Sequence, residues 1–560
     1  MMTQEKANEY NSFFATIGEN ILKELNLTVP ETKISDCKGF SFSEETEDTI
    51  GKLIDQMKTD VATGRDEINA RVIKDAKHLI TPPLTKIINL SYTMKVFPDC
   101  MKEAAIKPLH KKDDSNIISN YRPISILPCL SKIFERSASN QLIRYLEQAN
   151  LLSQCQHAYR KKHGTQTCLF QVISCVQKYL DQNELVAIVS LDLSKAFDAI
   201  NHEMLLQKLV KLGLSENSLL WIKSYLSNRK QCTKFANYTS EDKLITAGVP
   251  QGIILGPLLF ICFSNDIYES LEDECNAFSY ADDSQLILHA KNQRQLVKKI
   301  EQIIKMASSW YTKNCMKANQ SKTEILIINN RNIRAENIKI KIIEKGIVKY
   351  IKPKKFIKVL GVWIDENLTW KKQILHVKKV ASNTIRKLHR INHLIPMEIK
   401  VLLYNALVVP HFDYCDVIWG GCSSQNSQKL QVTQNFAVKS ITGLKKCDHA
   451  TKAFEKLQFL NLKQRRTIHE VVFTHKSLLE NHPQSICQMY VNQYSKNDTR
   501  SSKSFLNYPQ HRTQKFQNSP FYRTITAWNN VPSNISTTTT TKNFKMQYQR
   551  HIIKSTYSAH

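Results

Sequence analysis

The chain has 560 residues, and its 78 lysines and arginines against 50 acidic residues give a formal net charge of +28. That length predicts about three folded units, and 42% hydrophobic with 23% charged residues excludes a largely disordered protein. The longest apolar run, residues 253–263, is too short to span a bilayer. The excess of positive charge is typical of proteins that neutralise phosphate backbones.

Residues 1–90 are expected to form a helical N-terminal extension without a chemical motif. Apolar residues recur at helical spacing in "NEYNSFFATIGENILKEL", and prolines open and close "TPPLTKIINLSYTMKVFP". The first residues lack the basic start and apolar stretch of a secretory signal. The 14 cysteines form no C-x-x-C pair, which argues against a zinc site or a disulfide framework. We therefore expect an intracellular protein, in the cytoplasm or the nucleus, with no membrane partner.

Residues 91–365 alternate short apolar strands with longer amphipathic helices, which is the pattern of an α/β fold. The run "LVAIVSLDL", residues 185–193, is continuously apolar up to its acid, as a buried strand should be. In the next segment Leu205, Leu209 and Leu212 share one helix face, and Gly213 ends the helix.

Residues 366–475 are predicted to form a helical, basic region. In "TWKKQILHVKKVASNTIRKLHRI" one helix face could pack while the cationic face follows a polyanion or is simply solvated. Residues 476–560 are rich in Ser, Thr, Asn and Gln and include the tract "STTTTTKNF". Their composition predicts a polar, loosely ordered C-terminal region.

Two adjacent acids, Asp282 and Asp283, lie between strand-like flanks in "FSYADDSQLIL", which predicts a hairpin with the acids at or near its tip. At a tight turn both side chains can reach one volume. Neighbouring carboxylates repel each other unless a cation lies between them, and hard cations such as Mg²⁺ prefer oxygen ligands. The pair therefore favours a metal site, although a charged surface turn is the plainer alternative.

Asp192 strengthens the metal hypothesis because it ends the buried strand, where an unpaired charge is costly. Functional groups commonly lie at the carboxyl ends of parallel-type strands. Two metal ions about 4 Å apart, held by such acids, can activate a 3′-hydroxyl and stabilise a leaving pyrophosphate. Together with the basic charge, the three acids predict phosphoryl transfer on nucleic acid.

The same residues resemble a known family. Residues 280–283, Y-A-D-D, resemble the catalytic box of reverse transcriptases, and residues 192–197 resemble their first catalytic box. Other boxes follow in the family's order: "KPLHKKDDSNIISNYRPISILPCLSKIFER", "QHAYRKKHGTQTCLF", "AGVPQGIILGPLLFICFSNDI", "NCMKANQSKTEILII" and "FIKVLGVWIDENLTW". The segments "YNALVVPHFDYCDVIWG" and "QNFAVKSITG" resemble the thumb of jockey-like non-LTR retrotransposons. The resemblance extends from "NEYNSFF" to "ITAWNNVP".

The resemblance implies a right-hand polymerase with an α/β (α+β) fold. Fingers and palm would occupy residues 91–365, and the thumb residues 366–475. Asp192 and Asp282 would hold two Mg²⁺ ions, with Mn²⁺ as an alternative. Asp283 would support them, and the main-chain carbonyl of Leu193 would complete one coordination shell.

The resemblance also implies nucleotide-binding roles. Phe197 would exclude a 2′-hydroxyl, although a core aromatic is the alternative. Lys111, Lys112 and Arg122 would grip the triphosphate, although such residues are more often solvated.

Gln251 and Gly252 would lie close to the nucleotide or template, because the glycine-rich backbone permits a close approach. The alternative is that the glycines form a helix-packing face. Lys322 is a candidate proton donor to pyrophosphate. Two positions depart from the family pattern: Ile253 replaces its Ser, and Ala158–Tyr159 replaces Gly-Phe.

The expected function is RNA-directed DNA synthesis, with an RNA template, a DNA primer and dNTPs as partners. One alternative is a decayed element copy that binds nucleic acid without catalysis. Others are RNA-templated RNA synthesis and an intron-borne maturase. No endonuclease pattern precedes the boxes, so a separate or missing endonuclease is expected.

Overall fold

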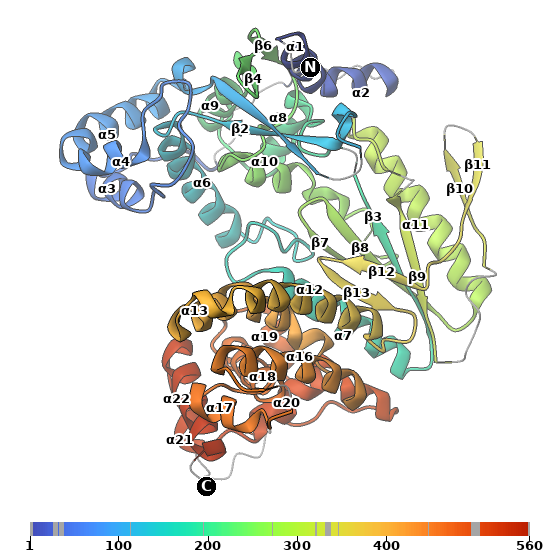
Figure 1. Cartoon of the computed structure of the whole chain (residues 1–560). Coiled ribbons are helices and arrows are strands. Elements are labelled where there is room, and N and C mark those ends of the chain that lie inside the picture. Colours follow the sequence, from blue (N-terminus) through green and yellow to red (C-terminus); the bar gives the residue numbers. More distant parts are fainter. Residues whose placement is uncertain are drawn as a thin grey trace. The chain divides into compact units, whose positions relative to one another are not determined.

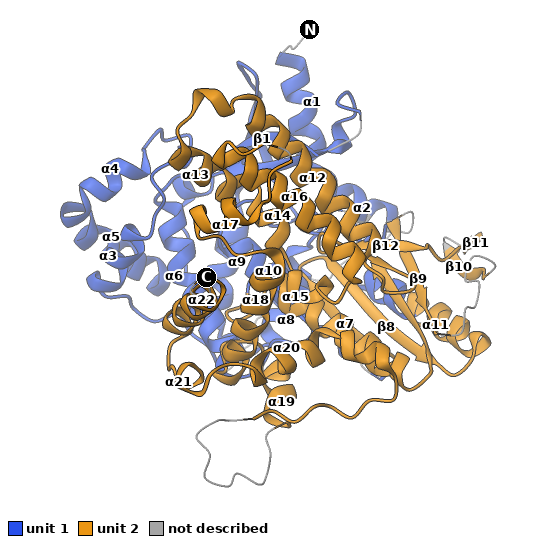
Figure 2. Ribbon diagram, turned by 60° about the horizontal axis from the view of Figure 1, so that its bottom comes forward, with its two compact units in different colours: residues 1–159, 192–273, 306–321 blue, residues 160–191, 274–305, 322–560 orange. Residues whose placement is uncertain are grey.

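The computed structural model describes residues 4–25, 32, 39–111, 114–193, 195–271, 273–319, 322–330, 338–344, 347–445, 447–493 and 505–557. The chain forms two compact units whose segments interleave along the sequence (Figure 2). Unit 1 comprises residues 1–159, 192–273 and 306–321, and unit 2 comprises residues 160–191, 274–305 and 322–560. The two units therefore cut across the predicted boundaries at 90, 365 and 475.

The first part of unit 1 is helical, as the sequence predicts. Its helices are α1 (Gln4–Ala15), α2 (Ile17–Leu25), α3 (Glu47–Asp55), α4 (Ala70–Asp75) and α5 (Lys77–Thr93), and the first 3-10 turn is η1 (Asp99–Met101). Helix α5 begins before the Pro82–Pro83 pair, which lies inside it, instead of beginning at the prolines. The Thr81 hydroxyl donates to the Lys77 carbonyl at 2.7 Å, which adds a side-chain hydrogen bond to the turn before the prolines.

The sheet of unit 1 runs in the order β2-β1-β4-β5, with β6 also on β4. Its strands are β1 (Ala104–His110), β2 (Tyr121–Ile126), β4 (Arg229–Phe235), β5 (Tyr238–Thr239) and β6 (Lys243–Ile245). Strand β1 pairs antiparallel with β2 and parallel with β4. The remaining elements are α6 (Ser131–Gln148), α8 (His202–Lys211), α9 (Glu216–Leu226), α10 (Leu255–Phe263), η2 (Ile118–Asn120) and η3 (Asn265–Ile267).

Aromatic side chains fill much of the interior of unit 1. Phe97, Phe134, Trp221 and Tyr225 are fully buried, and the Phe97 ring meets both Trp221 and Tyr225 edge to face. The Trp221 indole donates to the Ser91 hydroxyl at 2.8 Å, so its polar group is satisfied inside the core.

Unit 2 contains a four-stranded antiparallel sheet in the order β7-β8-β3-β9 (Figure 1). The strands are β7 (Asn276–Tyr280), β8 (Asp283–Ala290), β3 (Leu185–Leu191) and β9 (Glu324–Ile328). Helix α7 (Thr165–Asp181) contacts β3, β7 and β8. Its residues Leu169, Ile173 and Val176 join the core of unit 2 together with Val186 and Ile188 of β3. The central position of β3 explains its continuous apolar run.

Two hairpins follow the sheet: β10 (Ile340–Glu344) with β11 (Ile347–Ile351), and β12 (Phe356–Val359) with β13 (Val362–Asp365). Helix α11 (Gln293–Lys313) runs from a segment of unit 2 into one of unit 1. Helix α12 (Lys371–Arg390) buries Ile374, Val377, Ala381 and Ile385 at helical spacing. This amphipathic helix agrees with the predicted packing face.

The remaining elements of unit 2 are helical. They are α13 (Met397–Leu407), α14 (Val409–Asp413), α15 (Asp416–Trp419), α16 (Ser424–Thr442), α17 (Thr451–Leu457), α18 (Leu462–Leu478), α19 (Gln484–Val491), α20 (Pro520–Asn529), α21 (Ser533–Ser536), α22 (Thr541–Tyr557), η6 (Asn392–Leu394) and η7 (Gln514–Asn518). Within the described ranges, every helix is too short or too polar to span a bilayer.

The structure differs from the expectation for residues 476–560, whose described parts are largely helical and packed. Phe521, Ile525 and Trp528 of α20 and Phe544 of α22 belong to the core of unit 2. Polar residues dominate the composition, but the few apolar residues recur at helical spacing and fall on buried faces.

Candidate active site

The predicted acidic hairpin is present in unit 2. Tyr280 of β7 pairs with Asp283, the first residue of β8, so Ala281 and Asp282 form a two-residue turn. Ala281 has a φ of +58°, in the left-handed region that two-residue hairpin turns use. Asp282 is half-buried and Asp283 is exposed. The hairpin and the position of its acids confirm the sequence prediction.

Polar side chains inside the sheet fix the register beside this turn. The Ser279 hydroxyl donates to Ser284 Oγ at 2.9 Å, and Gln285 Nε2 donates to Ser190 Oγ at 3.0 Å. In this register Leu191, the last residue of β3, pairs with Ser284. Leu191 directly precedes Asp192, and Ser284 directly follows Asp283. The end of β3 and the acidic turn are therefore aligned within the sheet.

Asp192 and Leu193 follow β3 and belong to unit 1, whereas Asp282 and Asp283 belong to unit 2. The Asp192 carbonyl accepts a hydrogen bond from the Asn319 amide at 2.9 Å, and Leu193 forms a β-bridge with Ala318. Backbone contacts within unit 1 therefore fix the segment that carries Asp192. A common metal site for the three acids stays a prediction.

Unit 1 joins the segment that carries Phe197 to the loop that carries Gln251 by backbone hydrogen bonds. The Val249 amide donates to the Phe197 carbonyl at 2.8 Å, and the Ser125 amide donates to the Gln251 carbonyl at 2.8 Å. The Phe197 ring is half-buried and stacks on Phe260 at a centroid distance of 4.5 Å. The ring therefore packs against α10, and its role as a nucleotide gate stays a prediction.

The glycines of this loop have a conformational reason. Gly248 has a φ of +82° and Gly252 a φ of +90°, and both precede α10. A Cβ on Gly248 would lie 2.7 Å from the Asp198 carbonyl oxygen. These two glycines serve a tight backbone turn, so the helix-packing alternative does not apply to them.

Asp198, which the sequence reading missed, holds the predicted Gln251 side chain. Gln251 Nε2 donates to Asp198 Oδ1 at 2.8 Å. Desolvation raises the pKa of Asp198 to about 6, although the Gln251 hydrogen bond and the Lys195 charge oppose the rise. The available sequence signal was an acid directly after Phe197 in "KAFD".

Glu135 is a second missed residue, and it anchors the start of α10. Its carboxylate is fully buried and accepts hydrogen bonds from the amides of Ile254, at 2.7 Å, and Leu255, at 3.3 Å. Burial raises the pKa of Glu135, against the opposing charge of Arg229 and these amides. A carboxylate suits the positive end of a helix, and an acid within an apolar helical segment was the sequence signal.

The structure describes three of the four predicted cationic residues. Lys111 directly follows β1 and Arg122 lies on β2, and both side chains are exposed on this antiparallel hairpin of unit 1. Lys112 lies outside the described residues. Lys322 is exposed just before β9 in unit 2.

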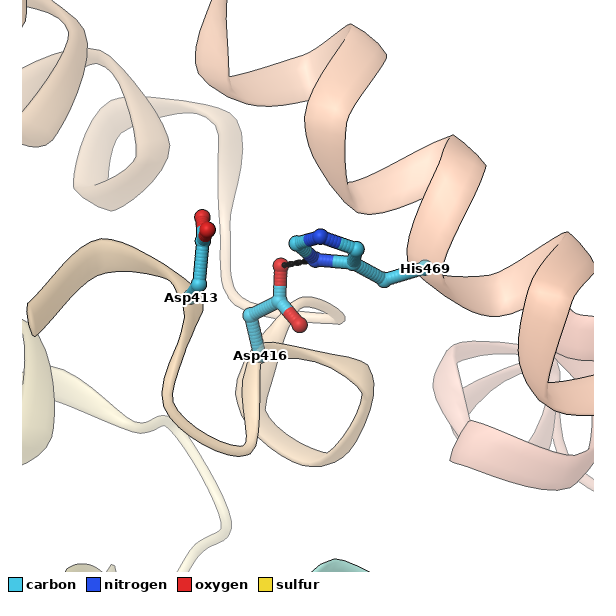
Figure 3. A group of neighbouring side chains, drawn as sticks. All are labelled: Asp413, Asp416 and His469. Atoms are coloured by element: carbon cyan, nitrogen blue, oxygen red, sulfur yellow. Dashed lines mark hydrogen bonds and ion pairs between the residues drawn. The ribbon is translucent and has the colours of Figure 1, made fainter. Parts of the chain in front are cut away.

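Unit 2 contains a second group of acidic residues, which lies far along the sequence from the predicted catalytic acids (Figure 3). Asp413, Asp416 and His469 place one ligand atom each within 4.8 Å of one another. In Figure 3 the two acids come from the α14–α15 corner and face His469 of α18. This spacing is compatible with a metal ion. Whether the group binds one depends on the charges beside it.

Those charges already balance the group. Arg465 Nε donates to Asp413 Oδ1 at 3.1 Å, and Arg465 Nη2 donates to Asp413 Oδ2. His469 Nδ1 lies 2.7 Å from an oxygen of the buried Asp416. Burial lowers the pKa of His469, but the Asp416 hydrogen bond and charge outweigh it and raise the pKa overall. We interpret the group as an ion-pair network that ties α18 to the α14–α15 corner.

Comparison with known proteins defines the class. Residues 109–364 match the family model described as reverse transcriptase (RNA-dependent DNA polymerase), and this range contains all three predicted acids. The protein therefore carries a reverse transcriptase domain, and the predicted α/β polymerase fold class is confirmed. Reverse transcriptases generally depend on divalent metal ions.

Individual relatives show which reverse transcriptases the chain is similar to. The chain is 25% identical over 411 residues to the RNA-directed DNA polymerase from mobile element jockey of Drosophila melanogaster, covering 72% of this chain and 44% of that protein. It is 24% identical to the probable RNA-directed DNA polymerase from transposon X-element of the same species, and the match covers 76% of this chain and 46% of that protein. These relatives support the predicted resemblance to the jockey-like reverse transcriptases of non-LTR retrotransposons. It spans less than half the length of these curated relatives.

Among solved structures, a telomerase from Candida albicans in complex with a fragment of telomeric RNA is similar at 12% identity and a TM-score of 0.38. The match covers 64% of this chain and 66% of that one.

Proposed function

We propose that this protein is the RNA-directed DNA polymerase of a non-LTR retrotransposon, which copies an RNA template by adding dNTPs to the 3′-hydroxyl of a DNA primer. The alignment of the acidic β7–β8 turn with the end of β3 carries the proposal. Asp282 lies at this turn, and Asp192 is the residue that follows β3. The match of residues 109–364 to the reverse transcriptase family supports the same activity.

The oxygen ligands of the three acids fit Mg²⁺. Asp192 and Asp282 would hold two Mg²⁺ ions, with Mn²⁺ as an alternative, Asp283 would support them, and the Leu193 carbonyl would complete one shell. When bound, the ions supply activation of the primer hydroxyl and stabilisation of the pyrophosphate that leaves.

The residues of unit 1 would position the nucleotide. Arg122, with Lys111 and Lys112, would bind the triphosphate, because a guanidinium fork suits phosphate oxygens. Glu135 and Asp198 hold the loop that carries Gln251 and Gly252, so that loop is fixed before the nucleotide arrives. In unit 2, Lys322 would give a proton to the leaving pyrophosphate.

The direct test is extension of oligo(dT) on poly(rA) by purified protein with dTTP and Mg²⁺ or Mn²⁺. We expect processive incorporation, and more incorporation with dTTP than with UTP. Salt-sensitive RNA binding by folded protein without any extension would instead select the decayed copy.

Phe197→Val tests the nucleotide gate. Removing the ring should admit the 2′-hydroxyl and raise the use of UTP relative to dTTP by about tenfold or more. A tenfold change corresponds to a steric penalty of about 1.4 kcal/mol. The measurement is the ratio of kcat/KM for dTTP and UTP. Unchanged discrimination in an active variant would remove Phe197 from this role and leave it as a core aromatic.

A further inference from the structure

Unit 2 contains a cavity of about 440 Å³ that the polymerase mechanism does not use. Its wall is formed by the start of α7, by α18 and the turn after it, by the α14–α15 corner and by α22. That volume is in the range of small-molecule sites. The cavity lies beside the Asp413 network, but its other walls are cationic.

Three lysines from separate parts of the sequence line this cavity: Lys162, Lys476 and Lys545. Within the described ranges, none of them forms an ion pair. The two acids in the wall, Asp413 and Asp416, are already balanced by Arg465 and His469. The cavity therefore has an excess of positive charge.

The first turn of α7 adds to this charge. Gly164 is the N-cap of this 17-residue helix, and Gln166 and Thr167 of the first turn line the cavity. The N-terminal end of a helix carries a partial positive charge and backbone N–H groups that suit an anion.

His482 is an independent indication of a ligand. It is only 8% exposed and lines the cavity. The Ser477 hydroxyl donates to the Phe473 carbonyl at 3.0 Å, so its oxygen accepts from His482 Nδ1 at 2.8 Å. His482 Nε2 has no hydrogen-bond partner among the described residues.

The environment of His482 keeps its imidazole neutral. Burial, followed by the charges of Lys476 and His163, lowers the pKa of His482 to about 3. Nε2 therefore carries a lone pair, and its residue lines a cavity that is also lined by cations. A matching ligand needs negative oxygens for the lysines and one hydroxyl that can donate to Nε2.

We propose that this cavity binds a phosphate group in a form that keeps one P–OH, either inorganic phosphate as HPO4²⁻ or the terminal phosphate of a nucleic-acid strand as its singly protonated monoanion. Its charged oxygens would face the lysines and the start of α7, and its hydroxyl would donate to His482 Nε2. An internal phosphodiester has no such hydroxyl, which separates this site from ordinary backbone binding. The inference does not depend on the proposed polymerase activity.

The test uses His482 itself as the probe in the full-length protein. Diethyl pyrocarbonate acylates neutral imidazoles, and mass spectrometry gives the rate at His482 relative to the exposed His78. Inorganic phosphate, at an ionic strength held constant with NaCl, should lower the acylation rate of His482 by about fivefold or more near saturation, because the bound ligand blocks Nε2. The double variant Lys162→Gln/Lys476→Gln should lose this protection.

A matched double variant, Lys452→Gln/Lys456→Gln on α17, removes the same charge away from the cavity and should keep the protection. Protection by a 5′-phosphorylated RNA oligonucleotide, but not by its 5′-hydroxyl counterpart, would assign the ligand to a strand terminus. Protection by inorganic phosphate alone would assign it to the free ion. Absence of protection by both, or equal protection in both double variants, would overturn the proposal.

Discussion

Unit 2 contains two groups of acids that differ in what surrounds them. Asp413 and Asp416 have ligand atoms close to His469, as in a metal site, but Arg465 and His469 neutralise them. Asp282, which is half-buried, and the exposed Asp283 lie at a hairpin turn that the sheet register aligns with the end of β3.

The difference shows that close spacing of ligand atoms is a weak sign of a metal. A carboxylate that already accepts both donors of an arginine fork must lose that partner before it can bind an ion.

Asp282→Asn should give the largest difference between the groups. It removes a proposed metal ligand, so nucleotide incorporation should fall by about 10³-fold or more. RNA affinity, measured by filter binding at one salt concentration, should change by no more than about twofold, because only one charge is altered. Asp413→Asn, the matched control, should keep incorporation within about threefold of the original protein. Retained synthesis by Asp282→Asn would overturn the assignment.

Chelation should distinguish the groups without any substitution. EDTA should reduce incorporation by about 100-fold or more, and added Mg²⁺ should restore it. The thermal unfolding midpoint should stay the same, because the Asp413 network is balanced without an ion. A marked fall of that midpoint would show that the network holds a structural metal.

Arg465→Met tests the network as a stability element. The change removes the guanidinium group that donates to both Asp413 carboxylate oxygens, so the unfolding free energy should fall by about 1–3 kcal/mol. Urea denaturation measures the effect, and Lys452→Gln, on the exposed surface of α17, serves as the control. A change as small as that of the control would mean that the ion pair contributes nothing to stability.

The smallest expected effect is the pH dependence of His469. Its folded pKa is raised above 6.5, so the stabilisation is fully present below that value and is lost as pH rises through the folded pKa. His469→Gln should flatten the decline in unfolding free energy that begins as the pH rises above about 6.5, measured by urea denaturation at a series of pH values. Parallel curves for the two proteins would contradict the assigned pair.

The sequence predicted the β7–β8 hairpin because its signals are local: apolar flanks, two adjacent acids and a short turn. It could not predict the Asp413 network, since Asp416 and His469 are 53 residues apart and only the packing of α18 brings them together. Glu135 was missed for the same reason, because its partners at Ile254 and Leu255 are about 120 residues away. Long-range partners leave no periodic pattern in a single sequence.

The C-terminal region shows a different limit. Composition predicted loose order for residues 476–560, yet Phe521, Ile525 and Trp528 are spaced to cover one side of α20. The average over the segment concealed this spacing. For such polar regions the positions of a few large apolar residues are more informative than their number.

The interleaving of the two units has a consequence for how the protein is made. The chain passes between them after residues 159, 191, 273, 305 and 321. A ribosome therefore releases parts of both units long before either is whole, and β3 emerges well before its neighbour β9 at residues 324–328. Unpaired strand edges in such intermediates invite misassembly. A premature stop anywhere from residue 160 to residue 321 would leave both units incomplete, so no single cut in that stretch yields one intact half.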